Sequence, residues 1–450
     1  MNSIRMTSNQ FEQLRSYLLS DIKESAAFLI AGFFKNNEGY HFTVRDIIIP
    51  HDSDYDDRTE YHIEVSAIFV NRVISIAERN QLTVIQCHSH PFAERKLSYS
   101  SSDNHGESVS AKTLYDCLGS KPMGSLLFGR DVITGRIWLS PNKMPIKVNE
   151  LRIVDRHMKI ENLDQSSKSQ KIDLETYDRQ IRAFGTKGQE LLSKLTIGIV
   201  GLGGTGSSVA EQLAREGITK FVLIDHDKFE NSNKTRLYGT YANTKKIPKV
   251  EIVRKNIEKI EPRAVITTIA KNVISQEVLK QLRNCDLVFS CTDNQSARSV
   301  INELAYQFYI PVIDVGVGLD ARNDRIVGGF VRSSVIGPSL PCLYCMGIID
   351  SDRILAESLN KEERFKRQKE GYITGFEDDV PSVIIFTTMA ATFGLFLFKD
   401  LLFNLLTTAA NTLALDITDF RSSRLAASVR HDCVCTHRMG RGEYMPLSAP

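Results

Sequence analysis

Short apolar strands and amphipathic helices alternate along the chain from about residue 195 to beyond residue 310. The expected strands are 195–200, 220–225, 265–270, 286–290 and 311–315, and the expected helices are 205–217, 249–260 and 295–308. Alternation of this kind favours a parallel, doubly wound sheet. The second half of the chain is therefore predicted to be an α/β, Rossmann-like domain.

The first half of the chain has a mixed pattern. The expected elements are helices at 11–18, 66–79 and 106–118, and strands at 26–32, 42–50, 82–88 and near 124–140. This is an α+β layout. A polar, Ser-rich run at 162–171 marks the break between the halves. We therefore predict one domain over 1–147, a linker over 148–174 and a second domain over 175–450.

Composition excludes several classes of protein. The formal net charge of +2 points to neither nucleic acid nor a membrane surface, and the N-terminus has no signal-peptide pattern. The apolar run 383–406 contains three threonines and the charged pair Lys399-Asp400, whereas a membrane span needs about 20 clean apolar residues. We expect a buried core helix there. Eight cysteines are too few for a disulfide scaffold, so a reducing, cytoplasmic setting fits.

A glycine loop, Gly201-Leu-Gly-Gly-Thr-Gly206, lies between the first expected strand and helix of the second domain. Its glycines let the backbone approach phosphate or ribose, and the helix N-terminus offers amides to anions. Asp225 ends the next strand, where a carboxylate can accept a hydrogen bond from a ribose hydroxyl. The same pattern fits an NAD-dependent dehydrogenase, so that alternative is open on this loop alone.

Further polar residues favour ATP. Ser232-Asn-Lys-Thr-Arg236 follows the second strand, Lys249 opens a helix, and Cys291-Thr-Asp-Asn294 follows a later strand. Hydride transfer needs no such cations. Attack of a carboxylate on the α-phosphate of ATP does need them, because the nucleophile and the phosphates are all negative.

In this order, Tyr177-Asp-Arg-Gln180, GLGGTG, LIDHD, SNKTR, PKVE, CTDN and Cys-x-x-Cys resemble the ThiF/MoeB/ubiquitin-activating enzyme superfamily over about 175–450. The resemblance implies adenylation of the C-terminal glycine of a ubiquitin-like (β-grasp) protein by a homodimer that uses ATP and Mg²⁺. A conjugating enzyme or a sulfur donor would be a further partner.

The resemblance also implies roles for single residues. It implies that the loop glycines contact the nucleotide, that Asp225 binds the ribose and that three polar side chains neutralise the phosphates. The CTDN motif would help to place Mg²⁺, and Arg179 of the partner subunit would act as an arginine finger. The positions concerned are Gly201, Gly203, Gly204, Gly206, Asp225, Asn233, Arg236, Lys249, Asp293 and Asn294.

Two cysteine pairs predict a structural zinc site. Cys342-Leu-Tyr-Cys345 has zinc-knuckle spacing, and Cys433-Val-Cys435 is one residue tighter than the usual second pair. His431 or His437 could therefore replace one thiolate. Thioester-forming members of the superfamily carry a cysteine after the first pair, and none lies between Cys345 and Cys433. The expected product is an acyl-adenylate, discharged to a sulfur donor, a separate protein or a serine hydroxyl of this chain.

The first half carries its own candidate site, Gln86-Cys-His-Ser-His-Pro91. His88 and His90 are two apart at a strand end, so their imidazoles share a face. Asp103 lies thirteen residues after His90. Two histidines, a carboxylate and a water make a catalytic zinc site. Glu24 is the expected general base from a neighbouring strand, and Ser100 the expected oxyanion donor.

This region, about 8–140, resembles the JAB/MPN metalloproteases with their JAMM motif, through HSHP and Ser100-Ser-Ser-Asp103. The spacing from the second histidine to the aspartate is two residues longer than usual. The resemblance implies zinc-dependent hydrolysis of peptide or isopeptide bonds at the C-terminus of ubiquitin-like proteins. His105 is expected to be a bystander.

Both halves thus point to the tail of a ubiquitin-like protein. The predicted function is bifunctional, with zinc-dependent processing or deconjugation and ATP-dependent adenylation of the same carboxylate. Three alternatives are kept: a sulfur-carrier adenylyltransferase with a tail-trimming protease, an NAD-dependent dehydrogenase, and a non-catalytic binding module.

Overall fold

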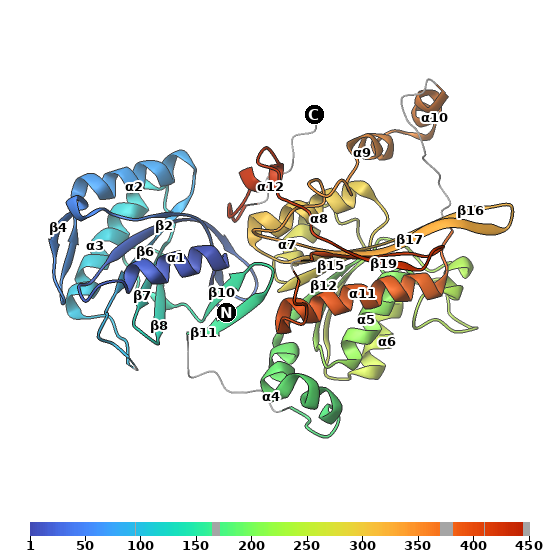
Figure 1. The fold of residues 1–450 in the computed structure, drawn as a ribbon, viewed down its shortest axis with the longest axis horizontal. Coiled ribbons are helices and arrows are strands. Elements are labelled where there is room, and N and C mark those ends of the chain that lie inside the picture. The colour runs from blue at the N-terminus through green and yellow to red at the C-terminus, as the bar shows by residue number, and fades with distance from the viewer. Residues whose placement is uncertain (95, 164–171, 370–380, 409, 444–450) are drawn as a thin grey trace. The chain divides into compact units, whose positions relative to one another are not determined.

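The computed structural model describes residues 1–94, 96–163, 172–369, 381–408 and 410–443 (Figure 1). The chain forms two compact units. The first unit contains Met1–Lys168, Gln307–Tyr309 and Arg438–Pro450, and the second contains Ser169–Tyr306 and Ile310–His437. Each unit has its own large sheet.

The first unit is built on a nine-stranded mixed sheet in the order β11-β10-β1-β3-β2-β6-β7-β8-β9. Its strands are β1 (Ser3–Met6), β2 (Ala26–Lys35), β3 (Tyr40–Ile48), β6 (Thr83–Ser89), β7 (Met123–Phe128), β8 (Ile133–Trp138), β9 (Ile146–Lys147), β10 (Glu150–Val154) and β11 (Met158–Asn162). A separate hairpin pairs β4 (Tyr55–Arg58) with β5 (Ile63–Val65).

Helices cover both faces of this sheet. They are α1 (Ser8–Leu18), α2 (Ala67–Arg79) and α3 (Ser101–Cys117), with a short 3₁₀ helix at Asp52–Asp54. Strand β2 shows the arrangement, because Ala27 and Leu29 belong to one apolar cluster and Phe28 and Ile30 to the other. A strand buried on both faces reads as a continuous apolar run, which is how residues 26–34 appear in the sequence.

The first unit extends further along the chain than the predicted boundary at residue 147. Residues 150–162, which fell in the predicted linker, form β10 and β11 at one edge of the sheet. Most of the Ser-rich run 162–171 lies outside the described residues. Helix α3 also starts at Ser101, five residues before the predicted start at residue 106.

The second unit is built on an eight-stranded sheet in the order β14-β13-β12-β15-β16-β17-β18-β19. The first five strands are parallel and the last three add antiparallel. The strands are β12 (Thr196–Val200), β13 (Lys220–Ile224), β14 (Val265–Ile269), β15 (Leu287–Ser290), β16 (Val312–Arg322), β17 (Arg325–Ile336), β18 (Thr412–Asp416) and β19 (Arg421–Leu425). The doubly wound, Rossmann-like prediction is confirmed.

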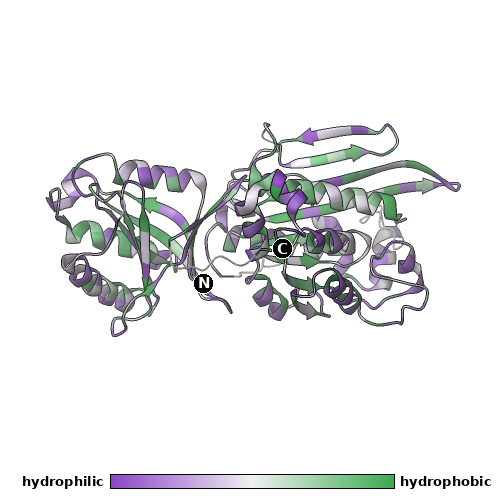
Figure 2. Cartoon of the chain, turned by 90° about the horizontal axis from the view of Figure 1, so that it is seen from below, coloured by the Kyte–Doolittle hydropathy of each residue, from purple (hydrophilic) through white to green (hydrophobic). Residues whose placement is uncertain are grey.

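The helices of the second unit are α4 (Asp178–Lys194), α5 (Gly204–Arg215), α6 (Lys249–Ile260), α7 (Gln276–Leu282), α8 (Gln295–Phe308), α9 (Ser351–Ser358), α10 (Lys361–Lys369), α11 (Ile384–Phe403) and α12 (Val434–His437), with a 3₁₀ helix at Asn231–Thr235. In Figure 2 hydrophobic and hydrophilic residues alternate along the helices of both units. Polar residues occupy the outer helix faces, as the amphipathic pattern predicts.

The long apolar run of the sequence forms helix α11. It is the one helix in the described part of the chain that is long and apolar enough to span a membrane by length and composition. It packs against α5, β16 and β17, and Lys399 and Asp400 near its end are buried. The Lys399 ammonium lies 2.9 Å from Glu216 Oε2, at the end of α5. This packing agrees with the expectation of a core helix.

Candidate functional sites

The strand register brings Glu24 to the two histidines of the first unit. Strands β2 and β6 are antiparallel with Ala26 opposite His88. Hydrogen bonds between Ser25 and Ser89 continue the pairing by one residue. The next pair is Glu24 and His90, and Glu24 Oε1 lies 3.4 Å from His90 Nε2.

Asp103 enters the same place from the first turn of α3. Its Oδ1 lies 3.3 Å from His88 Nε2, and its Oδ2 lies 3.5 Å from His90 Nε2. One ligand atom from each of these three residues lies within 4.8 Å of the others. The structure therefore brings together the histidines, the aspartate and the glutamate that the sequence predicted.

The electrostatics of this cluster are those of a partly buried site. Burial opposes ionisation of Asp103, but the neighbouring imidazoles of His88 and His90 outweigh it and hold the pKa of Asp103 well below its usual range. Burial raises the pKa of Glu24. His88 Nε2 is buried and lacks a hydrogen-bond partner that meets normal geometry. An orphaned imidazole nitrogen facing a carboxylate and a second imidazole fits a zinc ligand set.

Ser100 and His105 flank this cluster. The Ser100 hydroxyl oxygen accepts a hydrogen bond from the Asp103 N–H at 3.1 Å, and the Ser100 N–H donates to Asp103 Oδ2 at 2.6 Å. This capping box fixes the start of α3. Ser100 thus orients Asp103 in this structure, and its predicted oxyanion role stays a prediction. His105 is exposed.

In the second unit, the glycine loop follows the carboxyl end of β12 and leads into α5. Gly201 has φ +84°, a conformation that favours glycine. A Cβ on Gly206 would lie 1.8 Å from the Gly201 carbonyl oxygen, and a Cβ on Gly204 would lie 2.9 Å from Thr387 Oγ1 on α11. A Cβ on Gly203 would meet open space. Gly206 and Gly204 are therefore required by packing, whereas Gly203 faces the open side of the loop.

Two aspartates follow β13, and they differ in the groups that contact their carboxylates. Asp225 is buried and accepts hydrogen bonds from the N–H groups of Leu202 at 2.6 Å and Asp227 at 2.8 Å. Asp227 is about half exposed and lies 2.8 Å from the ammonium of Lys249. Asp225 therefore holds the glycine loop in place, and Asp227 is the carboxylate that is open to a ligand. Both aspartates belong to the same LIDHD run, and the assignment of the ribose to Asp225 stays a prediction.

The remaining predicted residues lie beyond the carboxyl ends of β13 and β15. Arg236 is partly exposed, and its guanidinium donates to the Ser232 carbonyl at 2.9 Å. Asn233 Oδ1 accepts from the Glu230 N–H at 3.1 Å. Asp293 is exposed, whereas Asn294 caps α8 by accepting from the Ala297 N–H at 2.8 Å. Asn294 therefore has a structural task in the CTDN loop.

Arg179 lies in the first turn of α4 and is exposed. Its side chain forms no hydrogen bond or ion pair with the residues that the structure describes, so it is available to a ligand or a neighbouring subunit.

A buried charge cluster beside the CTDN loop was not predicted. Asp314 on β16 lies 3.1 Å from Arg298 Nε and 2.8 Å from an Arg332 nitrogen, and it also accepts from the Ser290 hydroxyl at 3.0 Å. Two guanidinium groups share one carboxylate, so the cluster keeps a net positive charge. Arg298 lies five residues after Asp293 on the following helix, and that spacing was the signal available in the sequence.

The four predicted zinc cysteines converge in the second unit. Sulfur–sulfur distances are 3.7 Å for Cys342–Cys345, 3.4 Å for Cys342–Cys433 and 3.8 Å for Cys345–Cys435. Tetrahedral Zn–S bonds of about 2.3 Å place sulfurs about 3.8 Å apart. All four thiols lie within 4.8 Å of one another. The tighter Cys433-Val-Cys435 spacing is therefore compatible with four thiolates, without His431 or His437.

The other cysteines near the sheet are poor nucleophiles. Cys285 has no solvent exposure, and burial raises the pKa of the Cys291 thiol well above its usual range. Buried thiols of this kind are usually inert.

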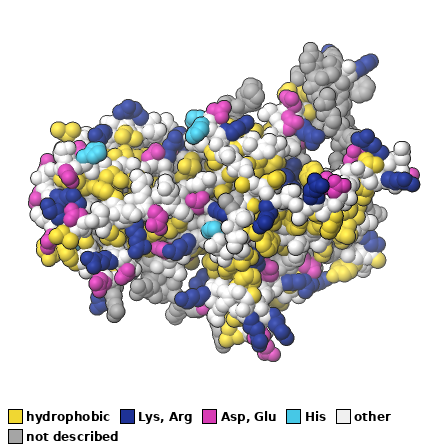
Figure 3. Space-filling view, viewed as in Figure 1, with side chains coloured by type: hydrophobic (Ala, Val, Ile, Leu, Met, Phe, Trp, Pro, Cys, Tyr) yellow, Lys and Arg dark blue, Asp and Glu magenta, His cyan; other side chains and the backbone are white. Residues whose placement is uncertain are grey.

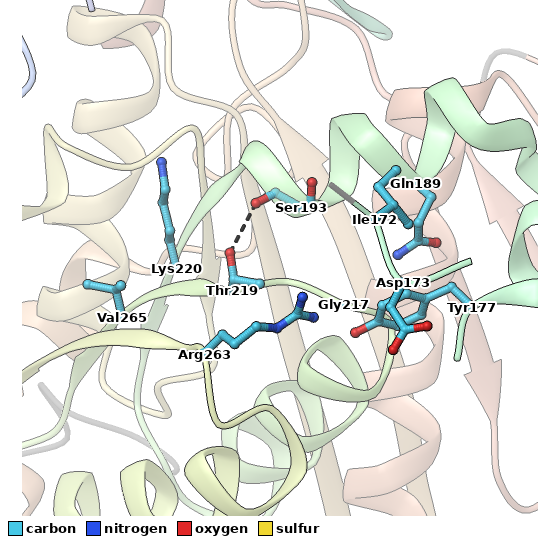
Figure 4. A pocket seen from close by; sticks show the side chains of 10 residues that line it. All are labelled: Ile172, Asp173, Tyr177, Gln189, Ser193, Gly217, Thr219, Lys220, Arg263 and Val265. Atoms are coloured by element: carbon cyan, nitrogen blue, oxygen red, sulfur yellow. Dashed lines mark hydrogen bonds between the residues drawn. The ribbon is translucent and has the colours of Figure 1, made fainter. Parts of the chain in front are cut away.

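A small pocket lies at the opposite end of the parallel strands. Figure 4 shows Thr219, Lys220, Arg263 and Val265 along it, where β13 and β14 begin, together with Tyr177. The glycine loop follows the carboxyl end of β12, so this pocket is separate from the candidate nucleotide site. Ligands of doubly wound sheets bind at the carboxyl ends of the strands, which favours the glycine loop.

Comparison with known proteins gives the following matches. The sequence model of the ThiF family matches residues 177–435. The molybdopterin-synthase adenylyltransferase of Salmonella typhimurium (strain LT2) is 34% identical over 181 residues, which cover 40% of this chain and 70% of that protein. The ubiquitin-like modifier-activating enzyme 5 of Culex quinquefasciatus is 31% identical over 173 residues, which cover 35% of this chain and 43% of that protein.

Among solved structures, E. coli MccB with ATP matches with a TM-score of 0.46 and 17% identity, over 58% of this chain and 74% of that one.

Proposed function

Because the chain belongs to the ThiF family through residues 177–435, we propose that its second unit transfers AMP from ATP to the C-terminal carboxylate of a ubiquitin-like protein. The relatives named molybdopterin-synthase adenylyltransferase and ubiquitin-like modifier-activating enzyme 5 support this reaction class. They also weaken the NAD-dependent dehydrogenase alternative.

The observation that carries the proposal is the gathering of cations and open carboxylates beyond the carboxyl ends of β12, β13 and β15. Arg236 and Lys249 offer positive charge to phosphates, and the partly exposed Asp227 can accept from ribose hydroxyls. The substrate carboxylate attacks the α-phosphorus, the bond to the bridging oxygen breaks, and pyrophosphate leaves. Fixed positive charge lowers the barrier because every reacting group is negative.

Mg²⁺ bound at the exposed carboxylate of Asp293 would offset charge on the phosphates as pyrophosphate leaves. The test is ATP–pyrophosphate exchange with a ubiquitin-like tail as acceptor. Asp293→Asn is expected to slow exchange by about 100-fold or more. Asp419→Asn, at an exposed turn between β18 and β19, is the matched control and should exchange normally. Equal exchange by Asp293→Asn and its control would reject this assignment.

The same relatives leave two outcomes for the acyl-adenylate. Transfer of sulfur would give a thiocarboxylate on the carrier protein, and conjugation would give an amide with a target. Mass spectrometry of the carrier after incubation with ATP and a sulfur donor distinguishes them, because the thiocarboxylate replaces one oxygen by sulfur.

For the first unit, the cluster of His88, His90, Asp103 and Glu24 supports a zinc-dependent peptidase. Zn²⁺ held by the first three residues would supply a water of lowered pKa. Glu24 lies opposite His90, with Oε1 3.4 Å from His90 Nε2. Burial raises the pKa of the Glu24 carboxyl, which makes the carboxylate a better proton acceptor. A peptide or isopeptide bond at the tail of the same ubiquitin-like protein is the proposed substrate.

Cleavage of a carrier protein that bears a C-terminal extension tests this second activity. Glu24→Gln should abolish cleavage and keep the zinc, and a chelator should abolish both. Cleavage by a metal-free preparation would contradict the assignment. Zinc binding without any cleavage would favour a binding module instead.

The apolar surface of α11 supports the proposal of a homodimer. Ile385 is 59% exposed and Phe396 is 40% exposed on this helix, and Figure 3 shows hydrophobic side chains gathered over the part of the second unit where Figure 1 draws α11. Exposed apolar patches of this kind often mark interfaces.

Subunit mixing tests the role of Arg179. Arg179→Ala and Asp293→Asn are each expected to be inactive alone. If Arg179 acts across the interface, a mixed dimer has one intact site, so mixing should restore part of the exchange activity. Without restoration, Arg179 does not act from the partner subunit.

A further inference from the structure

Helix α3 carries Asp103, but apolar packing does not hold the end of the helix where Asp103 lies. Of its seventeen residues, only Glu107, Ala111 and Leu114 are buried. The first two turns therefore have one buried side chain, Glu107, and that side chain is a carboxylate. Asp103 and Glu107 are four residues apart, so they lie on the same face of the helix.

The Glu107 carboxylate is fully occupied by side chains of two neighbouring strands. The Ser125 hydroxyl donates to Oε1 at 2.5 Å, while the Arg136 Nε–H and the Trp138 Nε1–H donate to Oε2 at 2.7 and 2.9 Å. Ser125 is on β7, and Arg136 and Trp138 are on β8. Glu107 itself is 5% exposed. Charge-assisted hydrogen bonds in a buried setting are strong and directional.

The same network reaches the residues on either side of Asp103. The Arg136 guanidinium also donates to Asn104 Oδ1 at 2.6 Å and lies 3.6 Å from the centre of the Tyr99 ring. The Tyr99 hydroxyl is 3.0 Å from the Ser125 hydroxyl. Tyr99 precedes the helix cap Ser100, and Asn104 follows Asp103. Contacts to β7 and β8 thus fix the chain before, after and one turn beyond Asp103.

We propose that Glu107 is a positioning residue for metal binding: its buried network with Ser125, Arg136 and Trp138 fixes α3 so that Asp103 completes the ligand set of His88 and His90. This rests on the zinc peptidase proposed for the first unit. His88 lies on β6, which is paired on both sides, and His90 follows this strand and donates its backbone N–H to the Phe128 carbonyl. Asp103 is the ligand that comes from a different element, so its position depends on how α3 is attached.

The test compares Glu107→Gln with Glu150→Gln in the full-length chain. Glu150 is an equally buried carboxylate of the same sheet, 2.8 Å from Arg152 on β10, and it has no role in the site. Glutamine would place an NH₂ group, which is itself a donor, where a Glu107 oxygen now accepts a hydrogen bond. Part of the network would therefore be lost. Both variants should lose thermal stability, which serves as the structural reference.

The readout is zinc retention against a graded series of chelator concentrations, with Co²⁺ absorption as the spectroscopic signature. Cobalt at the four cysteines shows strong sulfur-to-metal charge transfer, which a site of nitrogen and oxygen ligands lacks, so the two sites can be followed separately. Glu107→Gln is expected to weaken zinc at the histidine site by about 10-fold or more. Glu150→Gln should retain wild-type zinc affinity and the wild-type cobalt spectrum.

Two results would overturn the inference in distinguishable ways. If Glu107→Gln keeps wild-type zinc affinity and differs only in thermal stability, Glu107 is structural and the proposed peptidase stands. If the wild-type chain binds zinc only at the cysteines, the peptidase proposal itself fails, and the positioning role fails with it.

Discussion

The carboxylate of Asp314 forms ion pairs with two guanidinium groups. It has no exposed side-chain surface, and Arg298 and Arg332 lie 3.1 and 2.8 Å from its oxygens. Removing one partner of a buried ion pair leaves charge without compensation, which typically costs about 3–5 kcal/mol. We therefore expect Asp314→Asn to lower the free energy of unfolding by about 3 kcal/mol, measured by denaturant titration.

The same strand supplies the control for this prediction. Asp320 pairs with Arg322 at 2.9 Å on the exposed end of β16. Surface pairs contribute about 0–1 kcal/mol, so Asp320→Asn should have little effect. Equal effects of the two substitutions would show that burial does not set the strength of the Asp314 cluster.

Acid should remove the contribution of Asp314. Burial would raise the pKa of its carboxyl, but Arg298 and Arg332 together hold it below the ordinary value. A group with a lowered folded-state pKa stabilises fully above the unfolded value of about 3.9 and loses that contribution as the pH falls through the folded value. The difference in unfolding free energy between wild type and Asp314→Asn should therefore shrink below about pH 4. A constant difference down to acid pH would contradict this.

The sequence predicted single residues well where a pattern ties them to a strand end. His88 and His90 are two residues apart at the end of one strand, and Asp103 carries its own cap signal at Ser100. The choice between Asp225 and Asp227 could not be made in the same way. Both follow β13, and only the position of the Leu202 N–H shows that Asp225 is already occupied by the glycine loop.

At the scale of elements, the turn from β12 to α5 depends on close backbone contact. A Cβ on Gly206 would lie 1.8 Å from the Gly201 carbonyl oxygen, and a backbone oxygen cannot rotate away as a flexible side chain can. Gly206→Ala is therefore expected to lower the melting temperature by several degrees, since a shift of about 1–3 kcal/mol follows from overpacking, and to abolish ATP binding.

Gly203→Ala is the matched control for folding in the same loop. Its Cβ would meet no atom within 4 Å, and its backbone is extended with φ −72°. Its melting temperature should stay close to that of the wild type. If Gly206→Ala is as stable as Gly203→Ala and still binds ATP, the loop has more freedom than its contacts indicate.

Elements were predictable where apolar residues repeat with the period of the structure. The run from 26 to 34 and the strands around the glycine loop meet this condition, and they form as expected. The start of α3 does not, because Ser101-Ser-Asp-Asn-His-Gly-Glu107 contains no apolar residue. Polar contacts of Glu107 hold that part of the helix, and hydrophobic periodicity cannot report such contacts. Strands β10 and β11 were missed because they follow the core strands as a short hairpin at the sheet edge.

At the scale of the whole molecule, each unit has its own sheet and its own set of candidate catalytic residues. We therefore expect the two activities to be separable. Glu24→Gln should abolish cleavage and leave ATP–pyrophosphate exchange at the wild-type rate, and Asp293→Asn should do the reverse. The measurement is both assays on each variant, with melting curves to confirm folding. Loss of both activities from one substitution would indicate coupling between the units.

The overall architecture of the second unit followed from the order of its motifs, because a strand, a glycine loop and a helix fix the start of a doubly wound sheet. The extent of the first unit did not follow. Its last strand pair comes directly before the Ser-rich run at 162–171 and fell inside the predicted linker, and only the pairing of β10 with β1 assigns it to the sheet.

The four-cysteine cluster has a consequence for the order in which the chain can fold during synthesis. Cys345 and Cys435 are separated by 90 residues, and that interval contains α9, α10, α11, β18 and β19. A ribosome adds about 5–20 residues per second. Cys342 and Cys345 are therefore made several seconds before Cys433 and Cys435. Through that interval Cys342 and Cys345 are exposed to oxidants or foreign metal ions. We therefore expect the second unit to fold correctly only where these thiols stay reduced until the last strands have been made.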